Sequence, residues 1–280
     1  MYKMKYTFLN SFATLIGLLV LMGCEDVATN VKMPPAEKKI VVQCFISADD
    51  EIIKAMVTWS KPVLGTTVNA EPEVIMDAKV EIDGGGNKET LKWDATSKLY
   101  QLDSSFFKIE AGKAYTLTVT LPNGKNVSAS CVVPDSKNTS LALTHRDTLL
   151  SDFGGLEITC TFNYLDHDGL NTNYYRLEGH AIYPNPWDDH SVNGDFKKDT
   201  ELKASNTYKV MYYEDNFDKP EKVKAWIINC DLNYFEYHKT LQGAQYNMGL
   251  FSEPSIVYSN VNGGLGCFGA YCSFEIEVNL

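Results

Sequence analysis

Most of this 280-residue chain consists of short runs in which apolar and polar residues alternate, and this pattern limits the fold to one built mainly from β-strands. Successive side chains of a strand point to opposite faces, whereas a helix needs apolar residues three and four positions apart. The strictest run therefore predicts a strand with one buried face. Its apolar and aromatic members are Leu156, Ile158, Cys160, Phe162 and Tyr164.

Seven alternating runs between residues 39 and 134 predict an immunoglobulin-like β-sandwich as the N-terminal domain. Pro122-Asn123-Gly124 predicts a tight hairpin turn between the last two runs. Gly84-Gly85-Gly86 predicts another turn, because no helix follows it whose N-terminus could hold a phosphate. The predicted strands are Lys39–Ser47, Lys54–Trp59, Ala78–Ile82, Thr90–Trp93, Leu99–Leu102, Ala114–Leu121 and Val127–Val133.

A polar stretch from Pro134 to Asn138 marks the expected domain boundary. Residues 135–280 then predict a second β-rich domain with one helix and long loops. Besides the strand at 156–164, the strands expected there are Asn173–Ile182, Thr207–Tyr213, Val223–Cys230 and Ser273–Val278.

The helix is predicted near residues 231–242, with Asp231 as its N-cap. Tyr234, Tyr237 and Leu241 recur at helical spacing and form an aromatic stripe on one side of it. Such a stripe could pack in a core or hold a cofactor, and we expect core packing.

Residues 1–23 predict a lipoprotein signal peptide. Lys3 and Lys5 precede an apolar run too short to span a bilayer, which ends in Leu21-Met22-Gly23-Cys24. A buried core helix would instead need an amphipathic pattern. We expect cleavage before Cys24 and diacylation of this cysteine, which anchors the protein without spanning the membrane. The polar residues 24–38 then form a tether to the first domain.

The chain is acidic, with a formal net charge of −11 that becomes −13 when Lys3 and Lys5 leave with the signal peptide. Arg146 and Arg176 are its only arginines, and basic residues form no cluster. Nucleic acid and anionic lipid headgroups are therefore not expected as partners.

Six cysteines remain besides Cys24, and in an exported protein they permit three disulfides. The phase of each cysteine within its predicted strand favours one set of pairings, although each pair could equally be two free cysteines that pack as small hydrophobic residues. The pairs expected are Cys44 with Cys131, Cys160 with Cys230, and Cys267 with Cys272.

Two loops are candidates for binding. The segment from His180 to His190 combines imidazoles, carboxylates and aromatic rings, at His180, Tyr183, Trp187, Asp188, Asp189 and His190. We expect it to contact a protein or glycan partner; a transition metal and plain loop packing are the alternatives.

The second loop has oxygen ligands at Asp166, Asp168 and Asn171 beside a glycine, which could hold calcium. A tight turn uses the same residue types, and the loop lacks the later glutamate of a full calcium site, so the turn is favoured.

The glycine-rich stretch from Gly263 to Gly269 could be a flexible lid, or a place where two backbones approach closely. We expect the close approach, with this stretch as a loop lying flat on a sheet.

Motifs of the common enzyme classes are absent from the sequence: there is no nucleophile elbow, zinc-protease helix, Walker loop or dinucleotide fingerprint. We therefore expect a protein that is not an enzyme and needs no cofactor. A hydrolase whose residues converge from distant positions is the least favoured alternative.

Several segments resemble one group of Bacteroidota lipoproteins, catalogued as domain of unknown function 4249, over essentially the whole mature chain. These segments are Cys24 with its acidic followers, Lys39–Val42, Asn173-Tyr174-Tyr175-Arg176, Phe251–Pro254, Val257–Val261 and Gly263–Ala270. The chain departs from the family habit at Cys267, where an aliphatic residue is usual, and at Leu165–Asp168, where Asp-Pro is common.

The resemblance implies an outer-membrane lipoprotein, often exposed on the cell surface and encoded beside a TonB-dependent transporter. Glu25 and Asp26 look like a surface-export signal, although a solvated tether would have the same composition. We expect an accessory or substrate-capture subunit of such a transporter. The alternative is a stand-alone surface lipoprotein that binds glycan or metal.

Overall fold

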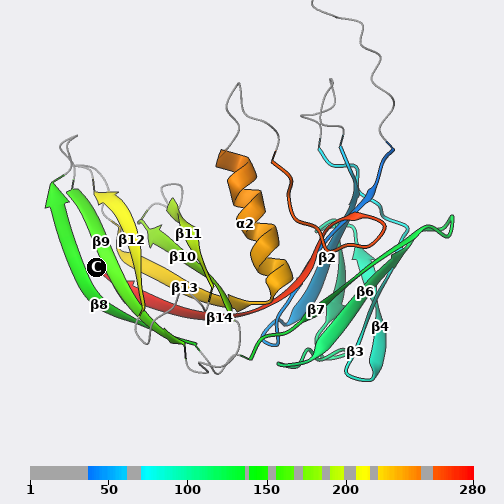
Figure 1. Cartoon of the computed structure of the whole chain (residues 1–280), viewed down its shortest axis with the longest axis horizontal. Helices are drawn as coiled ribbons and strands as arrows, with labels where there is room; N and C mark the ends of the chain where they lie inside the picture. The colour runs from blue at the N-terminus through cyan, green and yellow to red at the C-terminus, as the bar shows by residue number, and fades with distance from the viewer. Residues whose placement is uncertain are drawn as a thin grey trace, which may run out of the picture. The chain divides into compact units, whose positions relative to one another are not determined.

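A computed structural model describes residues 37–61, 71–135, 139–150, 156–166, 173–184, 190–198, 206–214, 220–246 and 255–280. The protein is mainly β, as predicted, with one helix, α2, in this part of the chain (Figure 1). Residues Lys38–Leu280 form one compact unit. No helix among the described residues is long and apolar enough to cross a membrane.

The strands of the first half begin and end within three residues of their predicted positions. Alternation therefore located them well, because each buries one face and exposes the other. They are β1 (Ile40–Ile46), β2 (Ile52–Trp59), β3 (Lys79–Gly84), β4 (Asn87–Asp94), β5 (Leu99–Asp103), β6 (Ala114–Thr120) and β7 (Asn126–Val132).

These strands pair antiparallel in the order β1-β2-β5-β4-β3-β6-β7. Strand β4 pairs with β3 through Leu91 and with β5 from Lys92 onward. It therefore joins the strands β1, β2 and β5 to the strands β3, β6 and β7. The predicted turn between β3 and β4 is confirmed: Gly85 and Gly86 have φ values of 61° and 88°, a conformation that glycine adopts without strain.

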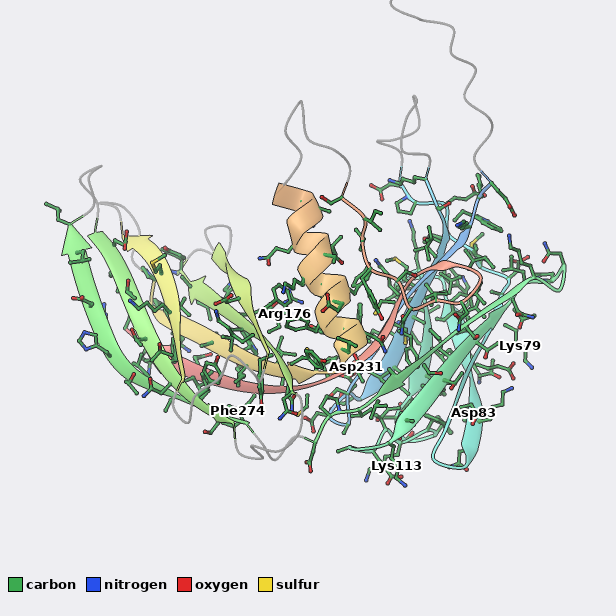
Figure 2. All side chains as sticks on the ribbon, in the orientation of Figure 1. Lys79, Asp83, Lys113, Arg176, Asp231 and Phe274 are labelled. Atoms are coloured by element: carbon green, nitrogen blue, oxygen red, sulfur yellow. The ribbon has the colours of Figure 1, made fainter. Side chains whose placement is uncertain are left out.

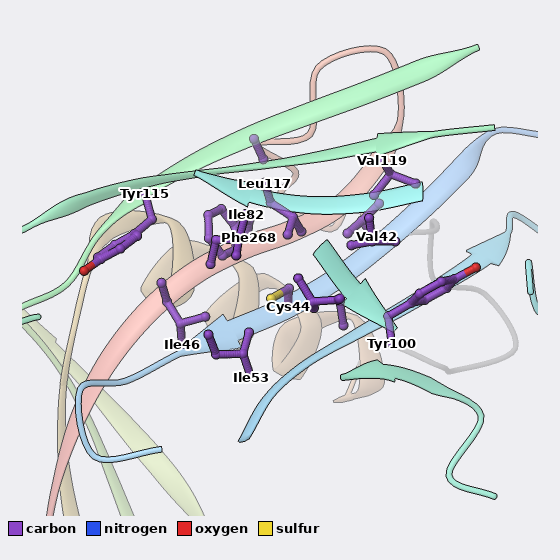
Figure 3. Close-up of a cluster of buried hydrophobic side chains, with 14 of the residues drawn as sticks. Val42, Cys44, Ile46, Ile53, Ile82, Tyr100, Tyr115, Leu117, Val119 and Phe268 are labelled. Atoms are coloured by element: carbon purple, nitrogen blue, oxygen red, sulfur yellow. The ribbon is translucent and has the colours of Figure 1, made fainter. Parts of the chain in front are cut away.

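The first core lies between these strands and contains mostly aliphatic side chains with a few aromatic rings (Figure 3). Its two buried tyrosines also hold connecting segments. Tyr115 Oη accepts a hydrogen bond from the Glu110 N–H at 2.8 Å. Tyr100 Oη donates to the Ile75 carbonyl at 2.9 Å and accepts from the Ala78 N–H at 3.0 Å. Both rings therefore bury apolar area while their hydroxyls satisfy backbone groups.

The second half contains the strands predicted from alternation, the predicted helix, and two strands that were not predicted. The elements are β8 (Thr139–Leu150), β9 (Leu156–Asp166), β10 (Tyr174–Ile182), β11 (His190–Lys198), β12 (Asn206–Glu214), β13 (Lys222–Cys230), α2 (Leu232–Tyr246) and β14 (Leu265–Asn279). The two unpredicted strands, β8 and β11, lie where loops were expected. Both are held by backbone pairing to a strongly alternating neighbour, β9 or β10.

Strand β14 corrects the expectation that the glycine-rich stretch is a loop. It begins at Leu265 and pairs in parallel with β1, from Val41 opposite Leu265 to Ile46 opposite Ala270. Farther along, it pairs antiparallel with β13. One sheet of eleven strands therefore runs through both halves of the chain. The predicted domain division near residue 134 stays a prediction.

The second core lies between the three-stranded sheet β12-β9-β8 and one face of β10, β13 and β14. The predicted half-buried strand is confirmed here, because Ile158, Cys160, Phe162 and Tyr164 are all buried. From the opposing sheet come Tyr175, Leu177, Val223, Ala225 and Ile227, at alternate positions of β10 and β13. The residues between them therefore occupy the other face of that sheet.

Candidate functional site

The residues of the two predicted binding loops are not brought together among the described residues. Cys24, Asp168, Asn171, Trp187, Asp188 and Asp189 lie outside these residues, and the side chains of Asp166 and His190 are not described. Tyr183 is only 8% exposed and packs in the second core. His180 lies within β10, on the face turned away from that core. The predicted partner contact of residues 180–190 stays a prediction, as do the calcium and transition-metal alternatives for these loops.

All six described cysteines are buried in the structure, and none of them forms a disulfide there. Burial raises the pKa of the thiols of Cys44, Cys131 and Cys267 well above the usual range. Such thiols react slowly, because the thiolate is the reactive form. Burial of this kind fits the alternative to disulfides, in which the cysteines pack as small hydrophobic residues. The three disulfide pairings stay predictions.

Strand register gathers a set of polar and aromatic side chains on the face of β10, β13 and β14 that turns away from the second core. Glu178 lies opposite Trp226, which lies opposite Glu275. The neighbouring rows are Arg176, Ile228 and Ser273 on one side, and His180, Lys224 and Glu277 on the other. We call Arg176, Glu178, His180, Lys224, Trp226 and Glu275 the Arg176–Trp226 face.

Arg176 is fixed at the end of this face that lies beside α2 (Figure 2). Its guanidinium forms an ion pair with Glu178 and donates a hydrogen bond to Tyr234 Oη at 3.2 Å. Its Cζ lies 5.9 Å from the centre of the Phe196 ring and 6.0 Å from that of Tyr234, within the range of cation–π contacts. Its Nε is buried and has no hydrogen-bond partner among the described residues.

Helix α2 is positioned by Asp231, as the sequence predicted. Asp231 Oδ1 accepts the Tyr234 N–H at 2.8 Å, which is the expected N-cap hydrogen bond. Burial raises the pKa of Asp231, although the backbone N–H groups of Tyr234 and Ala270 and the amide of Asn233 favour its charged form. The cap therefore stabilises the first turn, where Tyr234 and Phe235 enter the core.

The aromatic stripe of α2 packs as expected, but it includes one residue that the spacing did not indicate. The His238 ring lies 4.2 Å from that of Tyr234 and 4.9 Å from that of Phe45, centre to centre. Burial lowers the pKa of His238 to about 3, and the charge of Arg176 adds to this shift. His238 is therefore neutral at physiological pH, and its buried Nε2 has no partner within the described part of the chain.

Trp226 lies at the centre of the face. Its Nε1 donates to Glu275 Oε2 at 2.7 Å, and its ring centre lies 6.5 Å from that of His180. Lys224 forms ion pairs with Glu275 at 3.2 Å and with Glu277 at 3.4 Å. Side-chain exposures of 24% for Arg176 and 30% for Glu178 and Lys224 leave these groups within reach of a ligand.

Two surface pockets among the described residues lie elsewhere, in the first half of the chain. One, of about 470 Å³, is lined by residues that include Glu51, Asp103 and Lys108. The other, of about 520 Å³, is lined by residues that include Trp59, Met76 and Pro122. No group of three potential metal-ligating side chains occurs in the described ranges.

The C-terminal segment that carries the resemblance has a structural role in its described part. Asn260 exchanges two hydrogen bonds with the backbone of Phe268, donating to its carbonyl at 2.8 Å and accepting its N–H at 3.0 Å. The Asn260 and Asn233 side-chain amides both donate to the Ser130 carbonyl, at 3.2 and 3.1 Å. These bonds cover the outer edge of β7, which would otherwise be open to pairing with another strand.

Sequence reasoning missed the Arg176–Trp226 face, although a signal was present. Arg176, Glu178 and His180 alternate along one predicted strand, and Lys224 and Trp226 along another. The alternation therefore indicated one polar face on each of these two strands. It did not indicate that the strands, β10 and β13, are neighbours in the sheet.

A protein-family model described as "Domain of unknown function (DUF4249)" matches residues 27–277. No match to a curated protein was found.

Proposed function

This chain belongs to the family of domain of unknown function 4249, and from that premise we propose that it is a lipid-anchored outer-membrane protein that serves a TonB-dependent transporter as an accessory or substrate-capture subunit. We further propose that it stands on the cell-surface side of the membrane and catalyses no reaction itself.

The observation that carries the proposal is the sequence Leu21-Met22-Gly23-Cys24 at the end of a charged and apolar leader. Two acyl chains on one cysteine are enough for stable anchoring, whereas one is marginal. The acidic residues Glu25 and Asp26 directly after Cys24 support surface export. A soluble unit held beside a transporter by such an anchor needs only weak affinity for its partner, because tethering raises the local concentration.

The Arg176–Trp226 face supports the capture role. Its polar groups are carried by strands of one sheet, and sites on regular elements hold their geometry better than sites on loops. Its acidic and basic side chains are already joined in ion pairs, which favours recognition over proton transfer.

We also propose a domain architecture for the chain: an immunoglobulin-like sandwich at residues 39–134, followed by a second β-rich domain. The strand order β1-β2-β5-β4 and β3-β6-β7 is that of an immunoglobulin constant domain, with β4 paired to both sets. The hydrogen bond that Tyr115 Oη, at the start of β6, accepts from the Glu110 N–H supports this fold, because it resembles the tyrosine corner of such sandwiches.

The test is purification of the tagged, lipidated protein from outer membranes in mild detergent, with a Cys24→Ala variant as control. We expect the wild type to carry a palmitate label and to recover a TonB-dependent transporter in near one-to-one ratio. The variant should lose both the label and the membrane fraction. Recovery of no transporter, together with unchanged nutrient uptake after deletion of the gene, would contradict the proposal.

The second candidate is a stand-alone surface lipoprotein that binds a glycan or a metal. The exposed part of the Arg176–Trp226 face favours it, because an aromatic ring among polar groups is a common recognition surface. Ligand binding without a co-purifying transporter would distinguish it from the leading proposal.

A further inference from the structure

The charges of the Arg176–Trp226 face and its immediate neighbours cancel. Arg176, Lys222 and Lys224 supply three positive charges, and Glu178, Glu275 and Glu277 supply three negative ones. Every one of these six groups is in an ion pair: Arg176 with Glu178, Lys222 with Glu277, and Lys224 with Glu275 and Glu277. Among these described groups, a ligand with a net charge would meet no unpaired opposite charge, and it would have to break an existing pair to gain one.

The same groups form a fixed array of donors and acceptors around one aromatic ring. In the central row, Trp226 lies between the carboxylates of Glu178 and Glu275. Neighbouring strands are about 4.8 Å apart, so this row spans roughly 10 Å, the length of about two sugar rings. Hydroxyl groups both donate and accept hydrogen bonds, and they can therefore use lysine, arginine and carboxylate partners at once.

Two unsatisfied polar atoms lie at the α2 end of the array. Arg176 Nε is a donor, and the neutral His238 ring has one donor and one acceptor nitrogen. Both side chains contact the Tyr234 ring. A buried polar group without a partner is unfavourable and is usually satisfied by a water, which both donates and accepts.

A second ion-pair cluster, on a solvent-facing part of the sheet, serves as a comparison for the Arg176–Trp226 face. On β3 and β4, Glu81 pairs with Lys79 at 2.9 Å and Lys88 at 3.2 Å. Both lysines are more than half exposed, and none of these three described residues has a buried polar atom without a partner. The Arg176–Trp226 face differs in each of these respects.

From these observations we infer that the Arg176–Trp226 face binds a neutral, hydroxyl-rich ligand, a carbohydrate, with Trp226 against an apolar side of a sugar ring and Arg176, Glu178 and Glu275 hydrogen-bonding its hydroxyls. The inference rests on the proposed capture role and names the substrate class of that site.

The test is isothermal titration of the full mature chain with neutral hexasaccharides: maltohexaose, cellohexaose, mannohexaose and xylohexaose. Hexagalacturonate and the chitosan hexamer serve as charged probes of the same length. We expect a neutral hexasaccharide to bind most tightly. Its affinity should change little between about 50 and 500 mM salt, because no net charge is involved.

Variants then locate the site. Trp226→Ala should weaken binding by about tenfold or more, and Trp226→Phe, which keeps a ring, by less. Glu178→Gln should weaken it by roughly threefold to tenfold, because hydrogen bonds to a charged acceptor are the stronger ones. Glu81→Gln, in the comparison cluster, should leave binding unchanged. Trp226→Phe and Glu178→Gln keep the test decisive if Trp226→Ala does not fold.

Three results would overturn the inference: no binding of any neutral hexasaccharide at about 10 mM, tighter binding of a charged probe, or equal affinity in the Glu178→Gln and Glu81→Gln variants. Parallel pull-downs separate this failure from that of the proposed function. A transporter recovered with a protein that binds no sugar would leave the accessory role intact, whereas sugar binding without a transporter would refute that role alone.

Discussion

The Asp231 carboxylate accepts a hydrogen bond at 3.2 Å from the backbone N–H of Ala270, which lies 39 residues farther along the chain. The same oxygen caps α2 through the Tyr234 N–H at 2.8 Å. One side chain therefore joins the start of the helix to β14 at the end of its parallel pairing with β1. This arrangement makes Asp231 a link between the local cap and the sheet.

Substitution of Asp231 is expected to destabilise the fold beyond the loss of a cap. Asp231→Ala removes both bonds, and a lost N-cap alone costs about 1 to 2 kcal/mol. Asp231→Asn keeps an acceptor of similar shape and should cost less. Urea unfolding monitored by circular dichroism would measure both. An Asn variant as unstable as the Ala variant would show that the charge, and not the hydrogen-bond geometry, matters.

His238 is expected to make the protein sensitive to acid. Its pKa is lowered from 6.5 to about 3 in the fold, chiefly by burial. A group whose folded pKa is depressed contributes stability above its unfolded pKa, and that stability is lost as pH falls. The free energy of unfolding should therefore decrease between pH 6.5 and about 3, with a slope approaching 1.4 kcal/mol per pH unit from this one proton.

The measurement is urea unfolding of the wild type and of His238→Gln across this pH range. The variant should lack part of the decrease, because glutamine does not titrate. His145→Gln, at an exposed position on β8, serves as the control and should follow the wild type. Parallel curves for the wild type and His238→Gln would refute the assignment.

The sequence predicted most strands because each buries one face, as the run from Leu156 to Tyr164 illustrates. It failed for the first part of β14, where Gly266 to Ala270 are all buried and no alternation exists. Parallel strands buried on both faces lack a period of two, and a glycine-rich one also lacks β-forming side chains. The strand forms because its backbone pairs with that of β1.

The candidate site could not be predicted, for a related reason. The hydrogen bond between Arg176 and Tyr234 joins residues 58 positions apart, and it depends on the register of β10 with β13 and on the packing of α2. Local pattern located Asp231 and the tyrosines of the helix, but it does not encode which strand lies beneath them.

The buried cysteines are expected to be unreactive in the native protein. Burial removes Cys44, Cys160 and Cys230 from solvent, and it also raises the pKa of Cys230 well above the usual range. A thiol reagent such as DTNB should label none of the six in the folded state. Unfolding in urea without reductant then decides the pairing: six reactive thiols would exclude the predicted disulfides, and two unreactive cysteines, identified as Cys44 and Cys131, would establish the first pair.

Gly266 is the position where a methyl group should be least tolerated. Its φ of 101° is rarely adopted by other residues, and a Cβ there would lie 2.0 Å from the Val42 carbonyl oxygen. Gly266 and Val42 are paired with each other through their backbones. Neither residue can therefore move away without breaking the pairing of β1 and β14. Gly266→Ala should therefore lower the free energy of unfolding by several kcal/mol or prevent folding, well beyond the usual effect of about 1 kcal/mol.

Gly243→Ala is the matched control. Nothing lies within 4 Å of a Cβ at this position, and the residue is in α2, so the substitution should stabilise the protein by up to about 1 kcal/mol. A Gly266→Ala protein with the unfolding midpoint of the wild type would show that β14 does not approach β1 as closely as described.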